Sequence, residues 1–366
     1  ESVRAFVAGA LSPPLQPPRI LDAGCGTGVS TDYLCHLNPD AQVLAVDISA
    51  GALAVAEERL RRSGAAERVA ELRLERRSLL DLNGVGRFDY INSVGVLHHL
   101  DDPQAGLRAL AKRLEPEGLL HLFLYAEAGR WEIHKTQRAL ALMGVGTGEE
   151  GLRLGRRLLA ELPESNRLRL HHERRWALDT AADANFADMY LHPQETSYDL
   201  KGLFRFVEQA GLHFAGFSNP EVWDPARLLT GELLERARAL PQRAQWELVE
   251  ALDPDISHFE FFLCPRPLLP GPGDDAATLL ACGGRRNPCL WGWPSTSLLG
   301  PDLQPLSLES GDVALMEAFA SAAAGTPLAA LALPMPPDER VERARRLRRE
   351  RVLLPLLPGH GRRDPA

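Results

Sequence analysis

The pattern of hydrophobic and polar positions over residues 1–264 changes repeatedly between two kinds. Short apolar runs bounded by turn residues predict strands, and longer stretches with apolar positions three and four apart predict helices. Strands and helices that alternate in this way are typical of an α/β fold with a largely parallel sheet. The predicted strands are 19–21, 42–46, 69–74, the start of 87–103, 118–125, 212–217 and 257–264, and the main predicted helices are 2–11, 50–62, 103–114 and 200–210.

The first predicted strand runs into three glycines at alternate positions, Gly24, Gly26 and Gly28. Glycine allows a sharp turn and lets a ligand approach the backbone without a Cβ in the way. The amides at the start of the next helix would face that ligand. That helix has an apolar pattern expected to form one face, Val29, Tyr33, Leu34 and Leu37. A dinucleotide-binding loop would instead place its third glycine three positions after the second.

An aspartate follows the second predicted strand at a distance that suggests a shared ligand. Asp47 lies 19 residues after Gly28, close to the separation at which an acid in a Rossmann-type unit meets ribose hydroxyls. A carboxylate can accept hydrogen bonds from both hydroxyls. The alternatives are a glycine-rich turn without a ligand and a solvated aspartate at the end of a strand. The glycines and the acid occurring together favour a binding site.

Two motifs carry a resemblance to a known family. The pattern D-x-G-x-G-x-G at residues 22–28 resembles motif I of the class I S-adenosylmethionine-dependent methyltransferases. Residues 88–103, F-D-Y-I-N-S-V-G-V-L-H-H-L-D-D-P, resemble a segment common in bacterial members of the ubiquinone/menaquinone-biosynthesis type. The resemblance implies a Rossmann-like seven-stranded sheet with an antiparallel seventh strand. It also implies S-adenosylmethionine as cofactor and a methyltransferase activity.

The same resemblance suggests which residues bind the cofactor. In the family the glycine loop wraps the methionine end and the ribose, and residues after the third strand hold the adenine, often through an acid. Ser78 occupies that place here, and Leu79 is expected to offer an apolar face to the base. The expected cofactor-binding residues are Asp22, Ala23, Gly24, Cys25, Gly26, Gly28, Asp47, Ile48, Ser78, Leu79, Asn92, Ser93 and Val94.

Methyl transfer is an in-line displacement that depends mainly on proximity and orientation, although oxygen and nitrogen nucleophiles can also need a base. Candidate bases are His98 and His99 after the fourth strand, and His192 with Glu195 later in the chain. We favour His98 and His192 as catalytic residues. The alternative for each histidine is a structural role, such as capping backbone groups.

The pattern changes after residue 125, and this predicts the domain organisation. Residues 126–198 are expected to form a helical cap inserted over the cofactor site, within a methyltransferase domain of residues 1–264. Residues 265–275 are rich in proline and glycine and are expected to be a linker. Residues 276–366 predict a small α+β unit, winged-helix-like or a docking module, with helices at 312–324 and 337–351 and a strand at 352–357.

Composition excludes several classes of partner. The chain has 49 acidic and 41 basic residues and a net charge of −8, which argues against nucleic acid. Five cysteines without a zinc-like spacing argue against a metal site. The sequence has no apolar run long enough to span a bilayer and no signal-peptide pattern, so we expect a cytoplasmic protein that does not bind membranes.

The methyl acceptor is the least determined part of the interpretation. A large cap and the absence of a basic surface signature favour a small or medium organic molecule. One alternative is a protein lysine, because residues 192–217 resemble the stretch after the cap in methyltransferases fused to tetratricopeptide repeats or carrying a regulatory domain. The other is a non-catalytic scaffold that binds cofactor and holds a protein partner through the C-terminal unit.

Overall fold

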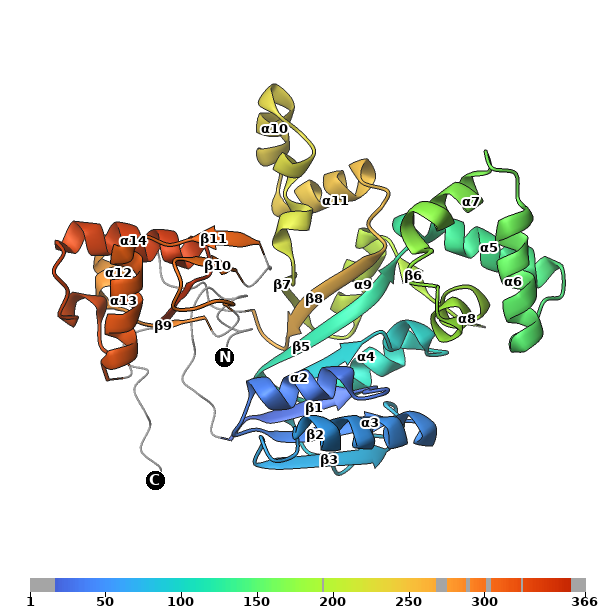
Figure 1. Ribbon diagram of the computed structural model, residues 1–366, viewed down its shortest axis with the longest axis horizontal. Coiled ribbons are helices and arrows are strands. Elements are labelled where there is room, and N and C mark those ends of the chain that lie inside the picture. Colours follow the sequence, from blue (N-terminus) through green and yellow to red (C-terminus); the bar gives the residue numbers. More distant parts are fainter. Residues whose placement is uncertain are drawn as a thin grey trace. The chain divides into compact units, whose positions relative to one another are not determined.

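The computed structural model describes residues 17–192, 194–267, 275–287, 290–300, 304–323 and 325–356. The chain divides into two compact units (Figure 1), one formed by Arg19–Pro265 and one that contains Arg266–Ala366. The predicted helix at 2–11 and most of the predicted linker lie outside the described residues.

The larger unit is built on one sheet with the strand order β3-β2-β1-β4-β5-β8-β7. All neighbouring pairs are parallel except those of β8, which runs antiparallel to both β5 and β7. This confirms the predicted seven-stranded sheet. A short strand, β6, adds to the end of β5 in parallel. The strands are β1 (Arg19–Ala23), β2 (Gln42–Asp47), β3 (Glu71–Arg76), β4 (Phe88–Val94), β5 (Leu114–Ala126), β6 (Ser197–Tyr198), β7 (His213–Phe217) and β8 (His258–Cys264).

Helices connect the parallel strands and are started by recognisable caps. The Ser49 hydroxyl accepts a hydrogen bond from the Ala52 N–H at the start of α3, and the Asp102 carboxylate does the same for the Ala105 N–H at the start of α4. Right-handed crossovers place α2 and α3 on one face of the sheet and α4 on the other. The helices are α2 (Val29–Leu37), α3 (Ala50–Ser63), α4 (Pro103–Ala111), α9 (Leu200–Gln209), α10 (Gly231–Arg238) and α11 (Gln242–Leu252), with one-turn helices η1 (Leu97–His99), η2 (Ala128–Arg130), η4 (Pro220–Trp223) and η5 (Pro225–Arg227).

The buried face of α2 differs from the prediction. Val29, Tyr33 and Leu37 are 50%, 65% and 58% exposed, whereas Thr31 and Cys35 are completely buried. The helix is present, but the predicted face is wrong for these three residues; Leu34, the fourth, is partly buried and packs against the hydrophobic cluster that contains Ile20 and Val43. A hydrogen bond explains which face of α2 is buried. The Thr31 hydroxyl donates to the buried carboxylate of Asp22, and this contact fixes the rotation of the helix.

Residues between β5 and β6 form a helical insertion with a hydrophobic core of its own. That core contains Ile133, Leu140, Leu159, Phe186, Tyr190 and Leu191. Since these residues pack on one another, the insertion is a small folded element. Its helices are α5 (Trp131–Leu142), α6 (Glu149–Glu161), α7 (Arg167–His171), the π-helical turn η3 (His172–Trp176) and α8 (Asp183–Leu191).

The smaller unit has two short antiparallel strand pairs, β9 with β12 and β10 with β11. Asp312 is fully buried in it, and its carboxylate accepts hydrogen bonds from Arg343 and Arg346. Among the described residues of the whole chain, no helix has the length and apolarity needed to cross a membrane. The elements of the smaller unit are α12 (Ala276–Ala281), β9 (Gly283–Arg286), β10 (Ser297–Leu299), β11 (Pro305–Ser307), α13 (Ser310–Ser321), η6 (Leu328–Ala330), α14 (Pro337–Arg349) and β12 (Leu353–Leu356).

Candidate active site

The three glycines after β1 all have left-handed backbone conformations, with φ of +84° at Gly24, +51° at Gly26 and +80° at Gly28. They differ in what surrounds them. A Cβ added at Gly24 would lie 2.4 Å from a methyl group of Val96, and one at Gly28 would lie 2.9 Å from the Cβ of Ala56. A Cβ at Gly26 would meet no atom within 4 Å. Packing therefore accounts for the outer two glycines, while Gly26 faces open space.

Asp47 lies directly against this loop. One of its carboxylate oxygens accepts the Gly26 N–H at 2.9 Å, and the other accepts the Ser49 N–H at 2.8 Å. Ile48, the next residue, is 70% exposed. The structure thus brings together Gly26, Asp47 and Ile48 at the carboxyl ends of β1 and β2, the edge at which open α/β sheets bind ligands.

A chain of buried hydrogen bonds lies beneath the loop. The Asp22 carboxylate accepts the Thr31 hydroxyl at 2.6 Å and the Asn92 side-chain amide at 3.0 Å. Burial raises the pKa of Asp22, and the hydrogen bonds from Asn92 and Thr31 oppose that rise. The Asn92 carbonyl oxygen lies 2.9 Å from Nδ1 of His121, whose Nε2 is 3.0 Å from the Glu260 carboxylate. These contacts connect β8, β5, β4, β1 and α2.

The remaining predicted cofactor residues are placed in different ways. Ala23 and Ser93 are fully buried, and the Ser93 hydroxyl donates to the Ala23 carbonyl oxygen at 2.9 Å. Cys25 is also buried, which together with Asp22 and Asp47 raises the pKa of its thiol to about 12. Val94 is 38% exposed at the end of β4. Asp22, Asn92 and Ser93 therefore support the loop from inside the sheet.

The predicted adenine contacts remain predictions. The Ser78 hydroxyl accepts the Leu80 N–H at 3.2 Å. Leu79 is only 6% exposed and belongs to the main hydrophobic core, whereas Leu80 is 54% exposed. In this structure it is therefore Leu80 that presents an apolar side chain to solvent after β3.

The two histidines predicted as catalytic lie in one aromatic cluster. His98 is 0% exposed, and its ring stacks on Tyr125 with a centroid separation of 3.8 Å. The His99 ring lies 4.3 Å from His98 and 4.1 Å from His192. Neither ring nitrogen of His98 has a hydrogen-bond partner among the described residues. Burial, followed by His99, lowers the pKa of His98 to about 3, so this ring is neutral at physiological pH.

Sequence reasoning missed Arg130, which holds the end of the insertion beside this cluster. Its guanidinium forms two hydrogen bonds of 2.8 Å to Glu195 and lies 3.5 Å from the centre of the Tyr125 ring. Burial alone would raise the pKa of Glu195, but His134 and Arg130 lower it to about 2. Both oxygens of Glu195 are occupied, so it is poorly suited to act as a base. The sequence offered no signal for this pair, because 65 residues separate its members.

Comparisons with known proteins agree with this geometry. Residues 21–120 match the family model described as "Methyltransferase domain". An uncharacterized protein of Synechococcus sp., syc1184_c, is 49% identical over 322 residues, which cover 86% of this chain and 76% of the relative. The ubiquinone biosynthesis O-methyltransferase of Xanthomonas axonopodis pv. citri is 32% identical over 141 residues, or 38% of this chain and 53% of that enzyme. The chain belongs to the class I S-adenosylmethionine-dependent methyltransferases.

Solved structures show the same methyltransferase fold. PKMT2 from Rickettsia typhi in complex with AdoHcy superposes with a TM-score of 0.61 and 19% identity, covering 78% of this chain and 56% of that one. A second structure of PKMT2 gives a TM-score of 0.65 and 17% identity over 97% of this chain and 75% of that one. The methyltransferase uses S-adenosylmethionine as its methyl donor.

The residues present fit this donor. Gly26 leaves room for a ligand at the turn, and each oxygen of Asp47 accepts one backbone N–H and retains a lone pair for a ribose hydroxyl. No group of three or more His, Cys, Asp or Glu side chains arranged for a metal ion occurs within the described part of the chain.

Proposed function

We propose that this methyltransferase methylates a small or medium organic molecule bound between the insertion and the carboxyl ends of β4 and β5. The observation that carries the proposal is the environment of His98. A buried polar group without a hydrogen-bond partner costs about 1–3 kcal/mol. His98 is fully buried in this structure, so a hydroxyl or amine of the acceptor would reach its ring only after the side chains around it move, and would then supply the partner that His98 lacks among the described residues.

S-adenosylmethionine would supply a methyl group on a sulfonium: the lone pair of the attacking nucleophile would form the new bond to the methyl carbon, and the electron pair of the broken C–S bond would stay on the sulfur of the departing adenosylhomocysteine. We propose that Asp47 and the backbone around Gly26 hold the donor and that Asp22, Asn92 and Ser93 keep the loop in shape. His98, being neutral, can accept a hydrogen bond from the attacking group and orient its lone pair. With a pKa of about 3, His98 is a weak base, so its role is to orient the nucleophile rather than to remove a proton before attack.

Protein methylation is the second candidate. The observation that favours it is the likeness of fold to PKMT2, together with the resemblance of residues 192–217 to methyltransferases that carry regulatory domains. The smaller unit would then serve as a contact for the protein substrate. A non-catalytic scaffold would account for the glycine loop as a cofactor-binding site, but it would not account for the missing hydrogen-bond partner of His98 among the described residues.

One experiment separates these functions. The full chain is incubated with methyl-labelled S-adenosylmethionine and either a metabolite extract or a protein extract of bacterial cells. Label in the small-molecule fraction that depends on Asp47 supports the first proposal, and label confined to protein supports the second. Binding of adenosylhomocysteine without transfer to either fraction would favour the scaffold.

A further inference from the structure

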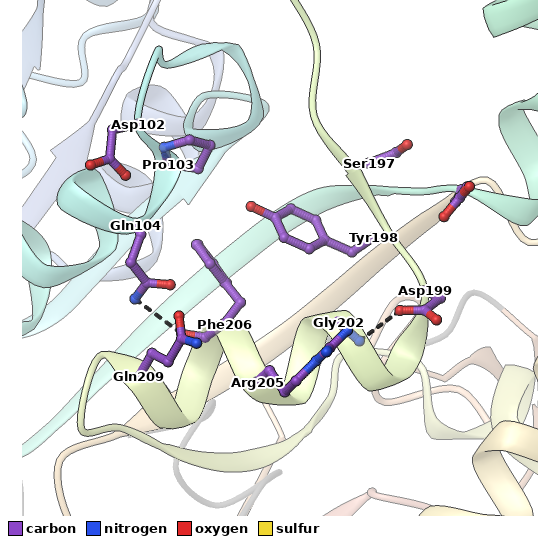
Figure 2. Close-up of a pocket in the computed structure, with 11 residues that line it drawn as sticks. Asp102, Pro103, Gln104, Ser197, Tyr198, Asp199, Gly202, Arg205, Phe206 and Gln209 are labelled. Carbon is purple, nitrogen blue, oxygen red and sulfur yellow. Dashed lines mark hydrogen bonds between the residues drawn. The ribbon is translucent and has the colours of Figure 1, made fainter.

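A cavity of about 430 Å³ lies between the start of α4, strand β6 and helix α9 (Figure 2). None of the residues predicted to bind S-adenosylmethionine lines it. Asp102 reaches it from the segment after β4, and Glu127 reaches it from the position directly after β5. Because the carboxyl ends of parallel strands meet at one edge of a sheet, the cavity lies at the same edge as the glycine loop.

The charged side chains that line the cavity are mostly acidic. Asp102, Glu127 and Asp199 contribute three carboxylates, and Arg205 contributes one guanidinium. Asp102 and Asp199 each use one oxygen to cap a helix, at 2.9 Å to the Ala105 N–H and at 2.6 Å to the Gly202 N–H. Their second oxygens and the Glu127 carboxylate accept no hydrogen bond from any residue that the structure describes, and Arg205 pairs with none of the three.

Aromatic side chains form the apolar part of the wall. Figure 2 shows the Tyr198 ring between α4 and α9, and its centroid is 5.0 Å from that of Phe206. Burial and then the charge of Asp102 raise the pKa of Tyr198 to about 12, so its hydroxyl stays protonated. The pKa of the nearby Glu250 is also raised, by burial first and then by carboxylates that include Asp199 and Glu127. Burial is the larger cause of both shifts, and in both the neighbouring carboxylates add to it.

A negative potential beside aromatic faces is the combination that recognises organic ammonium groups. We propose that this cavity binds an alkylammonium group of the methyl acceptor. The proposal rests on the proposed function and names a chemical feature of its substrate. The carboxylates stabilise the protonated amine, and a protonated amine has no lone pair with which to attack a sulfonium. The ammonium group is therefore an anchor, and a different atom of the acceptor receives the methyl group.

The test uses three probes of equal length, n-butylammonium, n-butanol and n-butyrate, titrated onto the full chain and followed by saturation-transfer NMR. We expect n-butylammonium to bind more tightly than either of the others. The double variant D102N/E127Q should weaken n-butylammonium binding about tenfold, as removal of two attractive charges predicts. Asparagine caps helices as well as aspartate does, so α4 should keep its start.

Two further variants make the result decisive. Asp224 is an exposed aspartate that caps η5 through the Ala226 N–H at 2.8 Å and does not line the cavity. D224N therefore removes a charge in a matched setting and should leave n-butylammonium binding unchanged. R205Q removes the cation from the cavity and should strengthen binding, which keeps the proposal testable even if the double variant does not fold.

Equal binding of n-butanol and n-butylammonium, a preference for n-butyrate, or equal effects of D224N and D102N/E127Q would overturn the ammonium site. Adenosylhomocysteine binding is measured on the same samples by calorimetry. Normal adenosylhomocysteine binding combined with no ammonium preference overturns the cavity proposal alone. Loss of adenosylhomocysteine binding in the unmodified protein would instead overturn the proposed function.

Discussion

The side-chain amide of Asn92 donates a hydrogen bond of 3.0 Å to the carboxylate of Asp22, inside the sheet and below the glycine loop. The orientation of that amide is determined from both ends, because its oxygen lies 2.9 Å from Nδ1 of His121. Asp22 also accepts the Thr31 hydroxyl from the first turns of α2. Through Asp22, β4 therefore holds both the strand that enters the loop and the helix that leaves it.

Replacing Asn92 by leucine should weaken both the fold and cofactor binding. The N92L variant leaves one oxygen of Asp22 without its donor and His121 without its acceptor, which we expect to cost about 2–4 kcal/mol. Urea unfolding followed by circular dichroism measures the loss. The exposed Asn185, whose amide donates one hydrogen bond to Asp179, provides the control N185L, expected to cost under about 1 kcal/mol. Equal losses in the two variants would contradict a special role for the Asp22–Asn92 pair.

Replacing Gly24 or Gly26 by alanine should change the stability of the protein by different amounts. In G24A the new methyl group would collide with Val96, so we expect a loss of about 2–4 kcal/mol in the free energy of unfolding. In G26A the added carbon meets no protein atom, and only the left-handed conformation is penalised, by about 1–2 kcal/mol. G26A should nevertheless lose most of its affinity for adenosylhomocysteine, measured by calorimetry. Undiminished affinity in G26A would show that the open space is not part of the cofactor site.

Asp47 should contribute to binding more than to folding. The D47A variant removes an acceptor for ribose hydroxyls, and we expect adenosylhomocysteine affinity to fall by about a hundredfold, equivalent to roughly 3 kcal/mol. The midpoint of thermal unfolding without ligand should change little, since the carboxylate is only half-buried. D40A, at an exposed position before β2, is the matched control. A tenfold or smaller difference between D47A and D40A would argue against the ribose contact.

The loop was predictable because its signals are local. Three glycines, an acid two positions before them and a second acid after the next strand lie within 26 residues, from Asp22 to Asp47. Each has a backbone or charge requirement that a sequence records directly. The seven-stranded sheet with one antiparallel strand followed from the same alternation of strands and helices, together with the family resemblance, and the structure confirms it.

The polar contacts between distant segments were not predictable. His121 meets Asn92 and Glu260 only because β5 lies between β4 and β8 in a particular register. The buried face of α2 was misjudged for a related reason, since hydrophobicity pointed to Val29 and Tyr33 while the hydroxyl of Thr31 turned the helix toward Asp22. The role of Arg130 likewise depends on its hydrogen bonds to Glu195, which only the folded chain brings beside it.

His98 should make the protein less stable as the pH falls below neutrality. Its pKa is about 3 in the folded protein, lowered by burial, against about 6.5 in an unfolded chain. Between these values the unfolded state binds a proton that the folded state does not, so the free energy of unfolding decreases with decreasing pH. At pH 5 the expected contribution is about 2 kcal/mol. Urea unfolding of the unmodified protein and of H98F, at pH 7.5 and pH 5, measures it.

The comparison with H98F isolates this residue from the others that titrate in the same window. His99, His172 and His258 also have pKa values lowered by burial, and they remain in both proteins. Glu195, with a pKa of about 2, adds its own loss of stability only at lower pH, as the carboxylate becomes protonated. H98F should therefore lose about 2 kcal/mol less than the unmodified protein between the two pH values. The exposed His213 provides the control H213Q, which should follow the unmodified protein. If H98F and the unmodified protein lose the same amount, His98 is able to take up a proton in the folded state, and a role as general base would replace the orienting role proposed for it.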